Sequence, residues 1–152
     1  MELGDFLKKG DVAKLANENV SKGDTFLMQM NADNGIIPKP GDSSRNKYFI
    51  VLGKLKDGSI FGGVIINSII NQNIPAGRQR LLMPIKCSKY AFLEHDSYVD
   101  CSSLKTAKPE KYNKWQYKGK VSDEDVDLIT GTLSESDYED KAKLKMFGIN
   151  GK

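Results

Sequence analysis

A pair of apolar runs joined by a glycine turn is the strongest folding signal in this 152-residue chain. Residues 48–52 (YFIVL) are apolar throughout, as in a strand that is covered on both faces. Residues 56–58 (KDG) follow, and Asp-Gly is a strong hairpin signal. Residues 60–67 (IFGGVIIN) supply the return strand, where Gly62 and Gly63 permit a bulge or sharp bend. The sequence therefore predicts a hairpin with a kink that could curl a small sheet into a barrel.

Other short strands are expected around this hairpin. Segments rich in apolar and β-branched residues predict strands over residues 25–30, 81–85 and 97–101, and residues 90–93 are a further candidate. Long polar loops are expected over residues 31–44 and 72–80. Short strands at close spacing favour a small barrel over alternating βαβ units, so we expect a mainly β fold with peripheral helices.

Two helices are expected outside the strands. Val12, Leu15 and Ala16 recur at helical spacing within residues 11–20. Ser122 is a good N-cap for a helix over residues 121–133, and the acidic residues that follow it favour the positive end of the helix dipole.

The expected organisation is a single domain over residues 1–152. An N-terminal helical extension is expected over residues 1–21, the barrel over 22–120 and a C-terminal helix over 121–133. Residues 134–152 are expected to form a polar, frayed tail with one helical turn near residues 142–147.

Charge is distributed unevenly, although the net charge is only +3. Residues 78–120 hold ten Lys or Arg and four Asp or Glu, whereas residues 122–140 hold eight acidic residues and no Lys or Arg. A basic surface beside an acidic segment suits a polyanion-binding protein. A lysine-rich loop that is merely solvated fits the same pattern.

Composition excludes several classes of protein. No apolar stretch approaches the roughly 20 residues that a membrane span needs, and no signal peptide is evident, so a cytoplasmic location is expected. Cys87 and Cys101 are expected to be reduced and partly buried, and with one histidine they are too few for a usual zinc site. A Ser-His-Asp triad would have to use His95, whose neighbour Asp96 is badly placed to orient it.

Four segments, in order along the chain, resemble strands of the PemK/MazF-like toxin family. Residues 22–28 (KGDTFLM) resemble its first strand, and residues 45–52 (RNKYFIVL) its Arg-Pro-apolar strand, with Asn46 in place of the proline. Residues 64–68 (VIINS) resemble the strand that ends in a small hydroxyl residue, and residues 96–106 (DSYVDCSSLKT) a later strand. The likeness covers residues 22–133. Relatives with RNA antitoxins share the same barrel.

This resemblance implies an SH3-like barrel and a metal-independent, sequence-selective endoribonuclease without a cofactor. In that chemistry the ribose 2′-OH attacks the adjacent phosphorus and leaves a 2′,3′-cyclic phosphate and a 5′-OH. Arg45 matches the family's arginine, whose planar donors suit a phosphate. Ser68 matches the hydroxyl residue that orients the phosphate or relays a proton. The implied partners are single-stranded RNA, an antitoxin made of protein or RNA, and a second copy in a homodimer.

Several polar residues are candidates for RNA contacts. Amides could read base edges and cations could bind phosphates; these candidates are Lys47, Asn67, Asn71, Gln72, Arg78, Arg80 and Lys105. Tyr112, Trp115 and Tyr117 lie among the lysines, where they could stack on bases or pack between loop and barrel.

Two other functions fit the same residues. One is a non-catalytic barrel that binds nucleic acid or a protein through its basic face, and the other is a protein-facing inhibitor or immunity factor. The ribonuclease hypothesis requires Arg45 and Ser68 to converge in a shared, positively charged groove.

Overall fold

The computed structural model describes residues 8–36, 41, 45–68 and 76–149. Its helices, including the short 3₁₀ helices η2 and η3, are α1 (Lys9–Asn19), η2 (Ala32–Asn34), α2 (Ala76–Gln79), η3 (Pro109–Lys114), α3 (Asp123–Ser134) and α4 (Lys141–Met146). Its strands are β1 (Asp24–Met30), β2 (Arg45–Lys54), β3 (Phe61–Asn67), β4 (Leu82–Ile85), β5 (Ser97–Ala107) and β6 (Gln116–Lys120). In this part of the chain no helix has the length and apolar character to cross a membrane.

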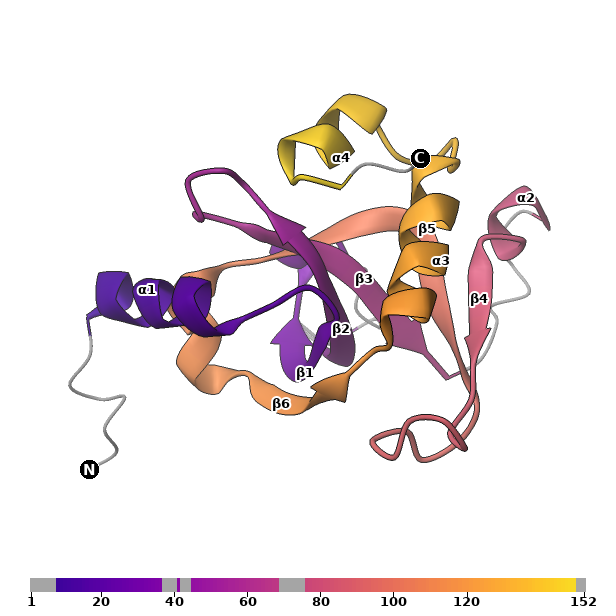
Figure 1. Cartoon of the computed structure of the whole chain (residues 1–152), viewed down its shortest axis with the longest axis horizontal. Coiled ribbons are helices and arrows are strands. Elements are labelled where there is room, and N and C mark those ends of the chain that lie inside the picture. The colour runs from indigo at the N-terminus through magenta and orange to yellow at the C-terminus, as the bar shows by residue number, and fades with distance from the viewer. Residues whose placement is uncertain (1–7, 37–40, 42–44, 69–75, 150–152) are drawn as a thin grey trace.

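The strands form one antiparallel sheet in the order β4-β5-β3-β2-β1-β6 (Figure 1). The prediction of a closed barrel is wrong, because β4 and β6 are the two edges of this sheet and do not pair with each other in the described residues. The predicted kink is present: the register shifts beside Gly63, both toward β2 and toward β5. The sheet therefore bends without closing.

Helix α3 gives a physical reason for the open sheet. It follows directly from β6, and its buried residues Val126, Ile129 and Leu133 join the same apolar cluster as Ile85 of β4 and Val99 of β5. Apolar surface that strand pairing would enclose in a closed barrel is covered here by a helix.

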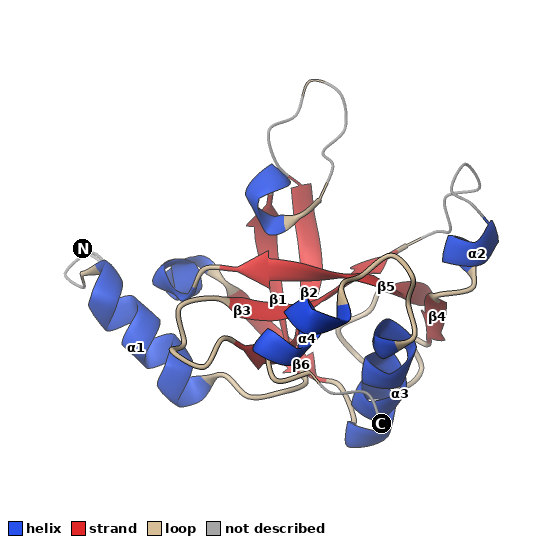
Figure 2. Ribbon diagram, turned by 90° about the horizontal axis from the view of Figure 1, so that it is seen from above, coloured by secondary structure: helices blue, strands red, loops and turns tan. Residues whose placement is uncertain are grey.

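Both faces of the central strands are buried, as the apolar run at residues 48–52 predicts. Alternate residues of β2 point to opposite sides: Ile50 and Leu52 join the cluster beneath α3 and α4, whereas Phe49 and Val51 join a second cluster with Ala16 of α1. Figure 2 shows α1 on one side of the strands and α3 on the opposite side, with α4 between them in this view. The result is a mixed α/β protein with two apolar layers.

The sequence located most of these elements. The helices at α1 and α3, the strands at β1 to β4, and the Asp-Gly hairpin between β2 and β3 are confirmed within a few residues at each end. Gly58 in that turn has φ +75°, a conformation that favours glycine. Ser122 caps α3 by accepting a hydrogen bond from the Asp125 N–H.

Other expectations need correction. Residues 90–93 form a turn rather than a strand, and β5 extends six residues beyond the predicted end at residue 101. The helical turn expected near residues 142–147 is confirmed as α4, but the segment is not a frayed tail, because Leu144, Phe147 and Ile149 belong to the core. The many charged residues of residues 134–145 make this segment look polar by composition and conceal its few apolar residues.

The two thiols also differ from expectation, since Cys87 is exposed and Cys101 is completely buried. Burial, with a smaller contribution from the neighbouring Asp100 carboxylate, raises the pKa of Cys101 to about 12. Because the thiolate is the reactive form, we expect a disulfide reagent at pH 8 to titrate about one thiol per folded chain, and both after unfolding in guanidinium. The folded Cys87→Ser variant should then have almost no reactive thiol, and its remaining thiol should react only after the protein unfolds. Rapid reaction of that folded variant would contradict the buried position of Cys101.

Candidate functional site

Three strand ends meet at one side of the sheet. Strands β2 and β3 are antiparallel with Tyr48 opposite Ile66, so the start of β2 lies beside the end of β3. Strand β5 is antiparallel to β3 with Tyr98 opposite Asn67, which brings the segment before β5 to the same place. The topology thus collects residues that are far apart in the sequence.

A cleft of about 260 Å³ opens at these strand ends, and both Arg45 and Ser68 line it. We call it the Arg45 cleft. Its other lining residues are Leu27, Asn46, Lys47, Tyr48, Ile66, Leu93, Glu94, His95 and Ser97. Arg45 is half-buried and Ser68 is exposed. Arg45 and Ser68, which the resemblance to PemK/MazF-like toxins singled out as catalytic, therefore border the same cleft at the ends of neighbouring strands.

Lys47 and Asn67 are cross-strand neighbours in this region. The Lys47 ammonium donates a hydrogen bond to the Asn67 side-chain oxygen at 2.7 Å. This contact fixes the Asn67 amide, whose NH₂ group is the remaining donor. With Arg45, Lys47 makes two cations at the cleft against the carboxylate of Glu94.

His95 is the residue that the sequence interpretation passed over. It lines the cleft from the loop before β5, and its Nδ1 lies 3.1 Å from the Asp96 carbonyl oxygen. A carbonyl can only accept, so this contact favours the tautomer with the proton on Nδ1 and leaves Nε2 as the basic nitrogen. Ser97 Oγ donates to the His95 carbonyl at 3.0 Å and lies 3.3 Å from Nδ1, which further restrains the ring.

A contact from β2 and a hydrogen bond within the connection between β4 and β5 hold the loop that carries His95. Tyr48 of β2 packs its ring against Phe92 at a centroid distance of 5.7 Å and donates its hydroxyl to the Phe92 carbonyl at 3.4 Å. The Asp96 carboxylate accepts a hydrogen bond from the Cys87 N–H at 2.9 Å. The sequence placed His95 just before a predicted strand. That position indicates a functional site only once β5 is known to pair with β3, because this pairing brings His95 to the cleft.

The remaining cations predicted to bind RNA do not line this cleft. Lys105 is buried, its ammonium donates to Ser103 Oγ at 2.9 Å, and burial lowers its pKa. Arg78 donates from Nε to Ser102 Oγ at 3.2 Å and lies 4.0 Å from the Asp100 carboxylate. Arg80 is exposed beyond α2. Asn71 and Gln72 lie outside the described residues.

The described residues contain no group of three or more His, Cys, Asp or Glu that could hold a metal ion. The groups at the Arg45 cleft are instead those of phosphate binding and proton transfer: a guanidinium, an ammonium, a hydroxyl and an imidazole. No model of a known protein family matches the chain, and a comparison with curated proteins also finds no match.

Proposed function

We propose that this protein is a metal-independent endoribonuclease that cleaves single-stranded RNA by attack of a ribose 2′-OH on the adjacent phosphorus. The observation that carries the proposal is that Arg45, Ser68 and His95, from three separate segments, line one cleft. The reaction needs hydrogen-bond donors for the phosphorane oxygens, which Arg45 can supply, and groups that accept and donate protons, which His95 and Ser68 can supply.

Each group has a proposed role. Nε2 of His95 accepts the 2′-OH proton as the O2′–P bond forms, and the Arg45 guanidinium stabilises the charge that develops on the non-bridging oxygens. As the P–O5′ bond breaks, the exposed Ser68 hydroxyl donates its proton to the leaving oxygen and takes one from water, and the hydroxide that remains is neutralised by the proton that His95 accepted. The Glu94 carboxylate repels the phosphate and so favours its placement toward Arg45 and Lys47.

A toxin held in check by an antitoxin of protein or RNA is the biological setting that we propose. The ordered likeness to PemK/MazF-like toxins supports this setting. In this proposal the sheet of the protein is an open, bent form of that family's SH3-like sheet, because the strands of the described residues do not close into a barrel.

Purified protein should cleave single-stranded RNA in EDTA into discrete fragments with 5′-OH ends, which a kinase labels without prior phosphatase treatment. The same sequence with 2′-O-methyl groups should resist cleavage, because its attacking oxygen is blocked. The His95→Gln protein, which keeps a polar side chain but no base, is the matched negative control. Intact RNA across several unrelated sequences, or cleavage of the methylated strand, would count against the mechanism.

A second candidate is a non-catalytic RNA-binding module. The observation that favours it is the row of exposed lysines on and around η3, which provides phosphate contacts independent of the Arg45 cleft; these are Lys108, Lys111, Lys114 and Lys118. Binding that weakens with salt, without any cleavage, would select this function.

A further inference from the structure

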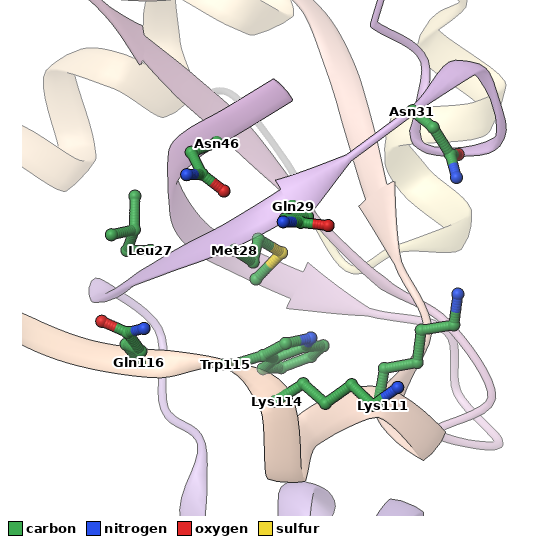
Figure 3. A pocket seen from close by; sticks show the side chains of 9 residues that line it. All are labelled: Leu27, Met28, Gln29, Asn31, Asn46, Lys111, Lys114, Trp115 and Gln116. Carbon is green, nitrogen blue, oxygen red and sulfur yellow. The ribbon is translucent and has the colours of Figure 1, made fainter. Parts of the chain in front are cut away.

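A second cleft, which we call the Trp115 cleft, lies between β1 and η3 and has a volume of about 670 Å³. This volume is within the range of about 300–1,000 Å³ that is usual for small-molecule sites. Figure 3 shows the Trp115 indole across from Met28 and Gln29, with the side chains of Lys111 and Lys114 beside it.

The cleft exists because β6 pairs with only part of β1. The pairing ends with Leu27 opposite Gln116, and the chain before Gln116 belongs to η3 rather than to a strand. The second half of β1, including Gln29, therefore has β2 on one side and the cleft on the other.

Trp115 is held in place from one side. Its ring lies 5.4 Å from Phe26, 5.6 Å from Tyr112 and 6.0 Å from Phe61, measured between centroids. It is nevertheless only half-buried and lines the cleft. An aromatic ring fixed in this way offers a surface on which a flat ligand can stack with little further loss of entropy.

The polar groups around the indole are those that a nucleotide requires. Lys111 and Lys114 are exposed, and in the described part of the chain neither forms an ion pair. The exposed amides of Gln29, Asn46 and Gln116 supply both donors and acceptors. Among the described residues that line the cleft there is no carboxylate, so none of them repels an anion. Cations, amides and an aromatic face are the usual means of binding single-stranded nucleic acid.

The Trp115 cleft and the Arg45 cleft share the lining residues Leu27 and Asn46. A strand whose scissile phosphate lies at Arg45 could therefore continue past Asn46 onto Trp115. We infer that the Trp115 cleft is a nucleobase-binding subsite for the RNA strand, in which a base stacks on Trp115 and Lys111 and Lys114 bind flanking phosphates. This inference rests on the proposed function for its substrate, but its test does not depend on cleavage.

Trp115 is the only tryptophan in the chain, so its fluorescence reports directly on this cleft. Titration with a mixture of 2′-O-methyl hexanucleotides, which cannot be cleaved, should quench the fluorescence in a saturable way. An oligomer of abasic sugar phosphates should cause little quenching, because it has no base to stack. The double variant Lys111→Gln/Lys114→Gln should bind at least about tenfold more weakly at low salt, with its salt slope reduced by about 1.4.

The double variant Lys141→Gln/Lys145→Gln removes the same charge from exposed positions of α4 and should bind like the unmodified protein. RNA cleavage without quenching by any hexanucleotide would overturn the subsite and leave the proposed activity standing. Quenching without cleavage would support the subsite and overturn the activity. Equal quenching by the abasic oligomer or by oligoglutamate would overturn base stacking in favour of a general polyanion surface.

Discussion

Replacement of Arg45 by alanine is expected to lower the rate of RNA cleavage at least about 100-fold, the usual loss when one donor to a developing oxyanion is removed. The reason is that Arg45 is the guanidinium of the cleft that also holds Ser68 and His95. Arg45→Lys should retain part of the activity, because lysine keeps the charge but loses the planar, two-pronged hydrogen bonding. Ser68→Ala should also lose at least about 100-fold. Single-turnover cleavage of a labelled RNA measures each rate.

Arg80→Ala is the matched control for this series. It removes the same charge from an exposed position that does not line the cleft, so cleavage should fall by less than about twofold. Near-normal rates for both Arg45→Ala and Ser68→Ala would refute the site assignment even if the RNA were cleaved. A large loss in Arg80→Ala would move the site toward α2.

The sequence predicted the strands of this site better than its chemistry. Arg45 and Ser68 could be proposed because the two strand segments that contain or precede them resemble PemK/MazF-like motifs. His95 could not be proposed in this way, because its position at the cleft depends on the pairing of β5 with β3. In the sequence, 29 residues separate Asn67 from Ser97, whereas in the structure the two strand ends are adjacent. Lys105 was predicted to contact RNA because a cation can bind a phosphate, but its side chain is buried and donates a hydrogen bond to Ser103.

The fold shows the same division between local and long-range information. The run at residues 48–52 correctly indicated a strand buried on both faces, but it did not say what buries each face. One face is covered by α3 and α4, whose apolar residues are spaced among charges, and the other by α1 with aromatic residues such as Trp115. A barrel was predicted because short strands at close spacing and kinks were visible in the sequence, whereas no local pattern showed that α3 covers apolar surface that strand pairing would otherwise enclose.

Phe147 provides a test of the finding that the C-terminal segment, which was expected to be a frayed tail, packs into the core. The ring is 5% exposed and belongs to the cluster with Ile50 and Val64. Gly62 allows its approach, since a Cβ on that glycine would lie 2.8 Å from the Phe147 ring, and a Cβ on Gly53 would collide with the Phe147 carbonyl oxygen. The glycines of the central hairpin thus allow the C-terminal segment to pack closely against the sheet, in addition to allowing the sheet to bend.

Phe147→Ala is therefore expected to lower the free energy of unfolding by about 3–5 kcal/mol, the usual cost of removing a buried phenyl ring. Met146→Ala is the adjacent control, and because Met146 is 65% exposed it should cost less than about 0.5 kcal/mol. Urea denaturation followed by circular dichroism gives both values. If residues 134–152 were instead a frayed tail, the two variants would unfold at the same urea concentration as the unmodified protein. A large loss in Phe147→Ala alone would establish that the segment after α3 completes the core beneath the sheet.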